Sequence, residues 1–453
     1  MTLDEGPYFS SSPRRRGAGD FNASEAKAPD THPRGCDVEE SPHRLLHIAI
    51  VGGGIIGYAC ALRLLRAGHG VTLLDDDANG TAASWGNAGH IATEQVAPLA
   101  SLAMLRSAPS RLFAFGGPLD LRQPWRLGGW IARYLAACAP ARHRSGCEAM
   151  RELLAGALPA WRDFVADLGV PELLRESGHI VCWGTPAAAR KGAAAWRSSD
   201  IGSAALGALD AATRAQLDRL LAKAPAGDIA FSHTAQIDDP QRLREHLRRR
   251  FSELGGQRRS CRVKALVRVQ EQVRLALDHG GELGVDQVLV CAGAHSGALM
   301  ATLGMRAPLV AERGYHLQWA DHDWPGDMPP VVFEDRAVIA TRFAGGLRVA
   351  GFVEYAPLDA SPDPRKWHTL ARHARELGLP VRGEPTRWSG ARPTLPDYLP
   401  AIGRSRGIPA LCYAFGHQHL GLTLAPVTAL AVEALINEKT PPVDLAAFDL
   451  ARF

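Results

Sequence analysis

The sequence lacks features that would each assign it to a class of proteins. None of its eight cysteines forms a C-x-x-C pair, so the common zinc and dithiol redox motifs are absent and we expect no metal site. The N-terminus carries no apolar core of a secretory signal. Scattered cysteines are typical of reduced thiols, so we expect a cytoplasmic protein. We also expect no transmembrane segment.

Net charge and repetition are also scarce. The formal charge of +4 over 453 residues gives no indication of nucleic-acid binding. No repeat with a period of roughly 20 to 50 residues is visible, so a solenoid is not expected. What the chain does have is 46% apolar residues and a length above that of a usual single domain. Residues 1–44 are rich in Pro, Ser, Asp, Arg and Gly, and we expect a disordered extension there.

The run HIAIVGGGIIG at residues 47–57 admits three interpretations: a membrane segment, a buried strand that simply turns, or a phosphate-binding loop. The apolar stretch 48–62 is too short for a membrane helix, which needs about 20 residues. A helical pattern follows and stops at Gly68, and VTLLD at 71–75 has the composition of a buried strand. Strand, glycine turn, helix and acid-ended strand together predict a dinucleotide-binding βαβ unit.

Each position of this unit has a physical role. Gly52 permits a tight turn, Gly54 lets the backbone approach a pyrophosphate, and Gly57 lets helix and strand pack closely. The helix N-terminus presents free N–H groups to the phosphates. Asp75 can accept both hydroxyls of an adenosine ribose. The unit alone does not distinguish NAD from FAD, and a glycine-rich turn in an unrelated α/β protein is the alternative.

Four later stretches bear on that choice. TAASWGNAGHIATEQ at 81–95 contains a small polar loop, for which an ordinary surface turn is the alternative. GVDQVLVCAGAHSGAL at 284–299 predicts a buried strand beside the first one, ending in small residues that let the backbone approach a cofactor. SGARPTLPDYLPAIGRS at 389–405 precedes CYAFGHQHLGLTLAPVTALAVEALI at 412–436, which predicts a strand, a glycine loop and a helix. That helix N-terminus could stabilise the anion of a reduced flavin.

Together these stretches resemble the flavoproteins of the glycine oxidase and D-amino acid dehydrogenase type, the DAO-type family. GGGIIG with Asp75, S-W-G-N-A-G, C-A-G-A-H-S, G-A-R-P with P-A-I-G, and G-H-Q-H-L-G-L-T-L-A-P occur in the family's order between about 48 and 436. The resemblance implies an α/β fold in which a discontinuous Rossmann-like domain binds FAD non-covalently. It also implies a second, α+β substrate domain on a mostly antiparallel sheet, and 308–355 alternates in the manner of strands.

The resemblance divides the chain between these two domains. The FAD-binding domain is expected at 45–100, 225–300 and 385–440, and the substrate domain at 101–224 and 301–384. Within the first domain, the ADP half of FAD is expected at the glycine turn and the flavin ring at the polar loop and the C-terminal glycine loop. The expected cofactor-binding residues are Gly52, Gly54, Ile55, Ile56, Gly57, Asp75, Ser84, Asn87, Ala88, Gly89, His90, Val263, Ala292, Gly293, Gly416, His417, Leu420, Gly421, Leu422 and Thr423.

Enzymes of this family oxidise an amine beside a carboxylate. Arg392, in G-A-R-P, matches the family's carboxylate-binding arginine, a role that suits the planar fork of a guanidinium. Tyr315, in RGYHLQW, falls where relatives place a tyrosine that covers the ring or hydrogen-bonds the same carboxylate, and a core tyrosine is the alternative. Glycine oxidases carry a second basic residue in the C-terminal glycine loop, where this chain has His419 instead of an arginine, which argues against glycine as the substrate. His419 could contact a hydroxyl or carboxylate of the substrate, and capping of the loop is the alternative. The implied chemistry is hydride transfer from the α-carbon to flavin, giving an imine.

The details of 81–95 and of G-A-R-P-T-L-P-D-Y-L-P most resemble bacterial enzymes of amino acid catabolism that oxidise D-hydroxyproline. The expected substrate is therefore cis-4-hydroxy-D-proline or D-proline. The expected electron acceptor is a quinone-linked carrier or oxygen, a dehydrogenase is favoured over an oxidase, and a quinone-linked acceptor would place the protein on the inner face of the membrane. Alternatives are a primary-amine D-amino acid dehydrogenase, a glycine or sarcosine-type oxidase, a nicotinamide-only dehydrogenase and a non-catalytic flavin-bound assembly protein.

Overall fold

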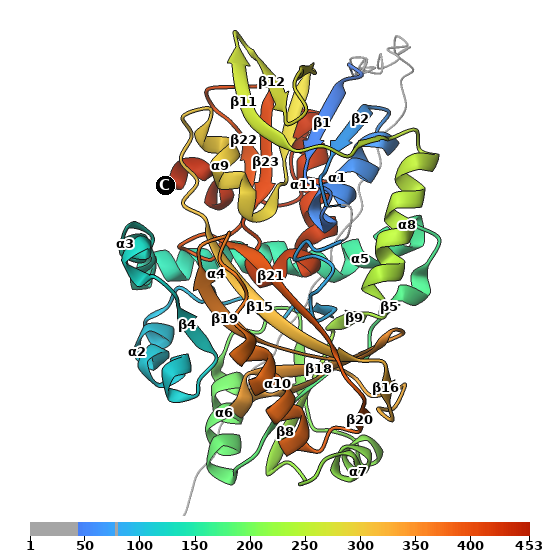
Figure 1. Cartoon of the computed structure of the whole chain (residues 1–453), viewed down its shortest axis with the longest axis vertical. Coiled ribbons are helices and arrows are strands. Elements are labelled where there is room, and N and C mark those ends of the chain that lie inside the picture. Colours follow the sequence, from blue (N-terminus) through green and yellow to red (C-terminus); the bar gives the residue numbers. More distant parts are fainter. Residues whose placement is uncertain (1–43, 78–79) are drawn as a thin grey trace, which may run out of the picture. The chain divides into compact units, whose positions relative to one another are not determined.

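The computed structural model describes residues 44–77 and 80–453, so the extension expected at 1–44 lies, apart from its last residue, outside the described part. A six-stranded sheet with the order β10-β2-β1-β14-β23-β22 carries the predicted βαβ unit (Figure 1). Its strands are β1 (His47–Val51), β2 (Gly70–Leu74), β10 (Gln257–Arg259), β14 (Gln287–Val290), β22 (Ala401–Arg404) and β23 (Leu411–Phe415). All neighbours run parallel except β22, which is antiparallel to β23.

The strand predicted within residues 284–299 is β14, and it lies beside β1 as expected. Ile48 of β1 pairs in register with Val71 of β2 on one side and with Gln287 of β14 on the other. Residues 48–51 of β1 are buried, as expected of a central parallel strand that is covered on both faces. Helix α1 (Ile55–Arg66) connects β1 to β2 and ends just before Gly68, whose φ of +90° is a left-handed conformation that favours glycine.

Helix α11 (Gly421–Ile436) begins where the sequence predicts and is a core element. It contacts α1, α5 (Ala157–Asp167) and β22. Residues Gln418–Ile436 are long and apolar enough to cross a membrane, but most of this stretch is buried inside the fold, as in the core helix of a globular protein. Within the described residues it is the one helix that meets this test of length and composition.

A second, nine-stranded sheet has the order β21-β15-β19-β18-β17-β6-β8-β7, with β4 paired to β19. Its strands are β4 (Leu119–Leu121), β6 (His179–Trp183), β7 (Ala205–Gly207), β8 (Gly227–Ser232), β15 (Val310–Trp319), β17 (Val331–Phe333), β18 (Val338–Phe343), β19 (Gly346–Ala356) and β21 (Thr386–Thr394). All neighbours are antiparallel except the pairs β6–β17 and β4–β19. The expected mostly antiparallel sheet is therefore confirmed, and with it the α/β fold class.

The remaining elements cover these sheets or connect them. The other α-helices are α2 (Leu102–Arg111), α3 (Gly128–Ala137), α4 (Pro140–Ala155), α6 (Pro186–Ser198), α7 (Ala211–Leu220), α8 (Pro240–Glu253), α9 (Ser296–Ala301) and α10 (Pro364–Leu377). Smaller sheets are formed by β11 (Val263–Val269), β12 (Gln272–Leu277) and β13 (Glu282–Gly284), by β3 (His90–Ile91), β5 (Leu174–Arg175) and β9 (Ala235–Ile237), and by β16 (Asp321–His322) and β20 (Val381–Arg382). Strands β8 and β21, which fall in segments expected for the FAD-binding domain, belong to the nine-stranded sheet; the division into domains stays a prediction.

Candidate active site

A cavity of about 1060 Å³ is lined by the carboxyl ends of β1, β2 and β14 and by residues of β15, β18, β19 and β21. Its volume is at the upper end of ligand pockets, which measure roughly 300 to 1000 Å³. The expected residues on its wall are Gly52, Gly54, Ile55, Ile56, Asp75, Ser84, Asn87, Ala88, Gly89, His90, Val263, Ala292, Gly293, Tyr315, Arg392, His417, His419, Gly421 and Leu422. Gly57, Gly416, Leu420 and Thr423 do not line it. Residues of the glycine turn after β1 and residues at the start of α11 thus line the same cavity.

The turn after β1 requires glycine at two positions. Gly52 has φ of +110°, and a Cβ there would lie 2.4 Å from the carbonyl oxygen of Cys291. A Cβ on Gly57 would lie 1.9 Å from the carbonyl oxygen of Gly52. Both distances are far below a van der Waals contact, so any side chain would force β1 away from β14 or α1 away from the turn. Gly57 therefore contributes close packing behind the cavity wall.

The N-terminus of α1 faces the cavity with little capping. Its N-cap residue, Gly54, provides no side-chain hydrogen bond, and the first turn contains no acidic residue. The N–H of Ile55 donates to Ser84 Oγ at 3.0 Å, which ties the polar loop to the helix. The first four N–H groups of a helix have no partner within it and favour an anion. This end of α1 therefore suits a pyrophosphate.

Asp75 follows β2 on the same wall. Burial raises the pKa of Asp75, although backbone N–H groups of Gly53 and Asp77 and the nearby Arg258 act in the opposite direction. The Arg258 guanidinium lies 3.9 Å from Asp75 Oδ2. A Cβ on Gly53 would meet that same oxygen at 2.5 Å, so the carboxylate lies directly against the turn. A carboxylate in this position can accept the hydroxyls of a ribose whose phosphates occupy the turn.

The polar loop after β2 is fixed by contacts with the other sheet. Asn87 Oδ1 accepts from the N–H of Gly89 at 2.6 Å, and the Arg348 guanidinium donates to the carbonyl of Asn87. His316 Nδ1 hydrogen-bonds with the carbonyl of Gly86 at 2.9 Å. Because Arg348 and His316 lie on β19 and β15, the nine-stranded sheet holds this loop in place.

The C-terminal glycine loop is held from within the core. His417 is buried and its Nε2 hydrogen-bonds with Thr428 Oγ1 at 3.1 Å. Burial lowers the pKa of His417 to about 3, so this side chain is neutral at physiological pH. Thr423 Oγ1 accepts from the N–H of Ala92 at 2.9 Å, which joins the first turn of α11 to the segment after the polar loop. Thr423 thus supports the cavity from behind its wall.

Arg392 has one edge bound to the protein and one edge open. Its Nη1 donates to Glu312 Oε1 at 3.0 Å and to the carbonyl of Phe352 at 3.3 Å. Neither Nε nor Nη2 hydrogen-bonds to a described residue, and a Cβ on Gly314 would lie 2.2 Å from Nη2. Gly314 therefore makes room for the open Nε–Nη2 edge, which has the two parallel donors that bind a carboxylate in a bidentate manner.

Glu312 was not identified from the sequence. It is buried, and its other oxygen accepts from Thr394 Oγ1 at 3.1 Å and from the Tyr398 hydroxyl at 3.2 Å. These hydrogen bonds fix the carboxylate, and the carboxylate in turn fixes Arg392. A glutamate in the strand sequence VAERGYHLQW has no local signal that distinguishes this position, because its partners come from β21 and the residues after it.

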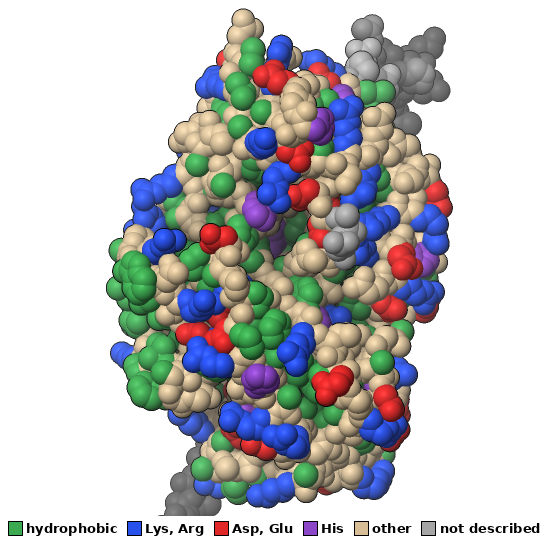
Figure 2. All heavy atoms as spheres, in the orientation of Figure 1, with side chains coloured by type: hydrophobic (Ala, Val, Ile, Leu, Met, Phe, Trp, Pro, Cys, Tyr) green, Lys and Arg blue, Asp and Glu red, His purple; other side chains and the backbone are tan. Residues whose placement is uncertain are grey.

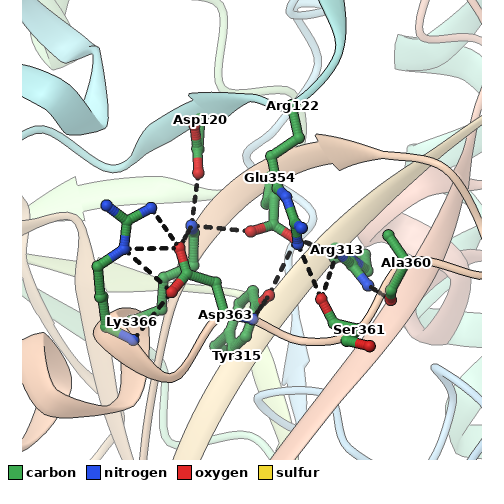
Figure 3. Close-up of polar contacts among 10 residues, drawn as sticks. Asp120, Arg122, Arg313, Tyr315, Glu354, Ala360, Ser361, Asp363 and Lys366 are labelled. Carbon is green, nitrogen blue, oxygen red and sulfur yellow. Dashed lines mark hydrogen bonds and ion pairs between the residues drawn. The ribbon is translucent and has the colours of Figure 1, made fainter.

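The hydroxyl of Tyr315 is used inside the protein (Figure 3). It donates to Glu354 Oε1 at 2.9 Å and accepts from the N–H of Asp363 at 3.0 Å. Glu354 also binds Lys366 Nζ at 2.8 Å and Arg313 Nε at 2.7 Å. Burial raises the pKa of Tyr315 to about 12, so the hydroxyl stays protonated. Tyr315 therefore contributes its ring to the cavity wall, as the core alternative predicts.

His419 is a neutral, buried group on the cavity wall. Its Nε2 hydrogen-bonds with Gln95 Oε1. Burial lowers the pKa of His419 to about 4, and the nearby Arg392 acts in the same direction. When Nε2 carries the proton that is donated to Gln95, Nδ1 remains as an acceptor. The histidine thus differs from the arginine of glycine oxidases in charge as well as in shape.

A further polar group on the wall was only partly foreseen. His90 Nε2 lies 3.3 Å from Glu94 Oε1, and the ring of His90 lies 4.5 Å from that of His179, centroid to centroid. Burial alone would raise the pKa of Glu94, but His90 and His179 outweigh it and lower this pKa to about 2. His90 Nδ1 and Glu94 Oε2 are buried and have no hydrogen-bond partner among the described residues. His90 and Glu94 both line the cavity, but these two unpaired atoms are buried within its wall.

Comparisons with known proteins agree with this geometry. Residues 47–435 match the family described as DAO, FAD dependent oxidoreductase. A D-amino-acid oxidase of Bradyrhizobium diazoefficiens is 30% identical over 419 residues, which cover 90% of this chain and 99% of that protein. D-amino acid dehydrogenase 2 of Pseudomonas aeruginosa is 28% identical, with 88% and 96% of the two chains covered.

Solved structures share the fold. Glycine oxidase from Geobacillus kaustophilus has a TM-score of 0.67 at 21% identity, with 90% of this chain and 99% of that chain covered. L-proline dehydrogenase from P. horikoshii has a TM-score of 0.67 at 16% identity, with 90% and 98% covered. The glycine turn, the open N-terminus of α1 and the carboxylate after β2 fit the ADP half of FAD. The chain belongs to the DAO family of FAD-dependent oxidoreductases, and FAD is its cofactor.

Proposed function

We propose that this enzyme oxidises a D-amino acid or a cyclic secondary amino acid to the imine, with cis-4-hydroxy-D-proline or D-proline as the substrate. The observation that carries the proposal is the open Nε–Nη2 edge of Arg392, which shares one cavity with the glycine turn after β1. A bidentate guanidinium at one end and a dinucleotide turn at the other are what an amino acid and FAD together require.

The side chains have distinct tasks in this reaction. Bound FAD would supply the hydride acceptor for the α-hydrogen of the substrate. Arg392 binds the substrate carboxylate, and Glu312 holds the guanidinium in the orientation that directs the α-carbon toward the cofactor. The buried ring of Tyr315 forms part of the wall of the same cavity. We propose in addition that the twenty residues expected to bind the cofactor contact FAD.

A polar group beyond Arg392 favours a substrate with its own polar substituent. The neutral His419 offers Nδ1, which can accept a hydrogen bond. A ring hydroxyl donates such a bond, whereas glycine has no side-chain group to do so. A second guanidinium at position 419, as in glycine oxidases, would not accept a hydrogen bond at all.

Anaerobic reduction of the bound flavin tests the proposal. The purified holoenzyme is mixed with D-hydroxyproline, D-proline, D-alanine, glycine or sarcosine, and the loss of visible flavin absorbance is followed. We expect the fastest bleaching with D-hydroxyproline. Arg392→Ala serves as the control, because it should keep the flavin and lose the bleaching. Rapid bleaching by D-alanine and none by the cyclic compounds would contradict the proposed substrate.

A primary-amine D-amino acid is the second candidate substrate. The relatives from Bradyrhizobium and Pseudomonas are named D-amino-acid oxidase and D-amino acid dehydrogenase. Bleaching by D-alanine in the panel above would favour this candidate, and an absence of bleaching by any amino acid would favour a non-catalytic flavin-bound protein.

We further propose a dehydrogenase that passes electrons to a quinone-linked carrier at the inner face of the membrane. Reoxidation of the substrate-reduced enzyme by a soluble quinone analogue and by dissolved oxygen, compared at equal concentration, tests this point. Faster reoxidation by oxygen would identify an oxidase.

The two-domain division predicted from the sequence is tested separately by limited proteolysis, which should cut near residues 100, 225, 300 and 385.

A further inference from the structure

Exposed hydrophobic side chains are concentrated in one part of the described chain. Ten large hydrophobic residues are exposed there, and six of them fall between residues 102 and 135. We call these six residues the 102–135 surface; they are Leu102, Leu105, Phe115, Leu121, Trp125 and Leu135. Phe115 and Trp125 are each 77% exposed. Large aromatic side chains this accessible are uncommon on a surface that faces only water.

Three of the six residues lie on helices that have almost no buried face: Leu102 and Leu105 on α2, and Leu135 on α3. Helix α2 buries none of its residues, and α3 buries only Ala137. A surface helix of a globular protein normally buries an apolar stripe against the core. The exposed leucines of α2 therefore have no covering element among the described residues, whereas Trp130 and Tyr134 of α3 pack on Tyr355 and Tyr398. Figure 2 shows hydrophobic side chains gathered at the left edge of the molecule, where Figure 1 places α2 and α3.

The same segment is strongly basic. Residues 101–144 contain seven arginines and a single acidic residue, Asp120. The carboxylate of Asp120 is engaged with Lys366 Nζ at 2.6 Å. Arg106, Arg126 and Arg144 are exposed and form no ion pair with a described residue. In Figure 2 arginine and lysine side chains lie beside the hydrophobic ones.

We propose that the 102–135 surface docks on an anionic lipid bilayer. Amphipathic helices that present Trp, Phe and Leu beside arginines bind at the boundary between headgroups and acyl chains, and each arginine near an anionic surface strengthens binding roughly fivefold. A second copy of the chain is disfavoured as the occupant, because a symmetric contact would bring unpaired arginines face to face. The inference rests on the membrane location proposed above, for which it names the docking surface, and it does not depend on the proposed substrate.

The docked surface adjoins the cavity. Arg111, at the end of α2, and Pro118, before β4, both line the cavity wall. A bilayer that receives Phe115 and Trp125 would therefore lie next to one side of the active site. A lipid-soluble electron acceptor could then approach the enzyme from the bilayer.

Vesicle sedimentation of the full-length holoenzyme tests the proposal. Vesicles of phosphatidylcholine with phosphatidylglycerol are compared with vesicles of pure phosphatidylcholine, at low and high salt. We expect binding to the anionic vesicles, weakened at least tenfold by high salt or by the double variant Phe115→Ser/Trp125→Ser. Arg106→Gln/Arg126→Gln should weaken binding to anionic vesicles by roughly 25-fold. Both variants should keep activity with a soluble acceptor, since none of these residues lines the cavity.

A matched control removes exposed apolar residues elsewhere. Val267 and Val269 are exposed on β11, and Val267→Ser/Val269→Ser should bind vesicles as the wild type does. Equal binding of the wild type to neutral and anionic vesicles would overturn the proposal, as would unchanged binding of the Phe115→Ser/Trp125→Ser variant. A dimer that dissociates in this variant, without vesicle binding by the wild type, would identify a second copy as the occupant instead.

Discussion

Replacing Arg392 should separate a catalytic effect from a structural one. Its Nη1 is 3.0 Å from Glu312 Oε1, and the side chains are 24% and 1% exposed. In Arg392→Ala the buried carboxylate keeps only its hydrogen bonds from Thr394 and Tyr398. Breaking a fully buried pair costs about 3 to 5 kcal/mol, and the partial exposure of Arg392 reduces this to about 2 to 4 kcal/mol. The variant should therefore melt at a lower temperature.

The loss of activity has a different origin. A bidentate, charge-assisted contact with a substrate carboxylate is worth about 3 kcal/mol, so kcat/KM should fall about 100-fold or more. The double variant Arg392→Ala/Glu312→Gln removes the buried charge as well, and we expect it to recover most of the thermal stability and none of the activity. Thermal melts and steady-state kinetics of the flavin-loaded proteins measure both quantities. Recovery of activity in the double variant would refute the role of Arg392 in substrate binding.

Three further outcomes follow from the described contacts. Gly52→Ala places a Cβ 2.4 Å from the carbonyl oxygen of Cys291, so the purified protein should lack the visible absorbance of FAD. Lys366→Met leaves three carboxylates together in the interior and should lower the free energy of unfolding by about 3 to 5 kcal/mol in denaturant titrations. Its control is Arg365→Ala, which breaks an exposed pair and should change the free energy of unfolding by less than about 1 kcal/mol. His417 has a folded-state pKa of about 3 against 6.5 for the unfolded chain, so the unfolded state binds more protons below pH 6.5. Stability should therefore fall as the pH drops from about 6.5 toward 3. His417→Asn should reduce this dependence of stability on pH, as measured in thermal melts recorded at several pH values.

The parts that could be predicted from the sequence are those with local signals. The βαβ unit follows from a continuous apolar strand, glycines at fixed spacing and an acid after the second strand, and β14 was placed beside β1 for the same reason. The start of α11 follows from the glycine loop before an apolar helical pattern.

The parts that were missed depend on contacts between distant segments. Glu312 meets Arg392 across two neighbouring strands, and no pattern within either strand distinguishes a buried ion pair from a surface one. Similarly, Glu94 pairs with His90, whose ring contacts that of His179 on the distant strand β6. The hydrogen bond between Tyr315 and Glu354 is equally invisible in the sequence, which left a core tyrosine and a tyrosine near the substrate as alternatives.

The order of the strands in the six-stranded sheet has a consequence for biosynthesis. β1 and its glycine turn emerge from the ribosome early, whereas β23 and α11, which complete the sheet and support the loop through Thr423 and Ala92, emerge last. The nascent chain therefore displays its nucleotide motif long before the flavin end of the cavity exists. Binding of the whole cofactor therefore requires β23 and α11, and the nucleotide motif alone does not provide the complete site.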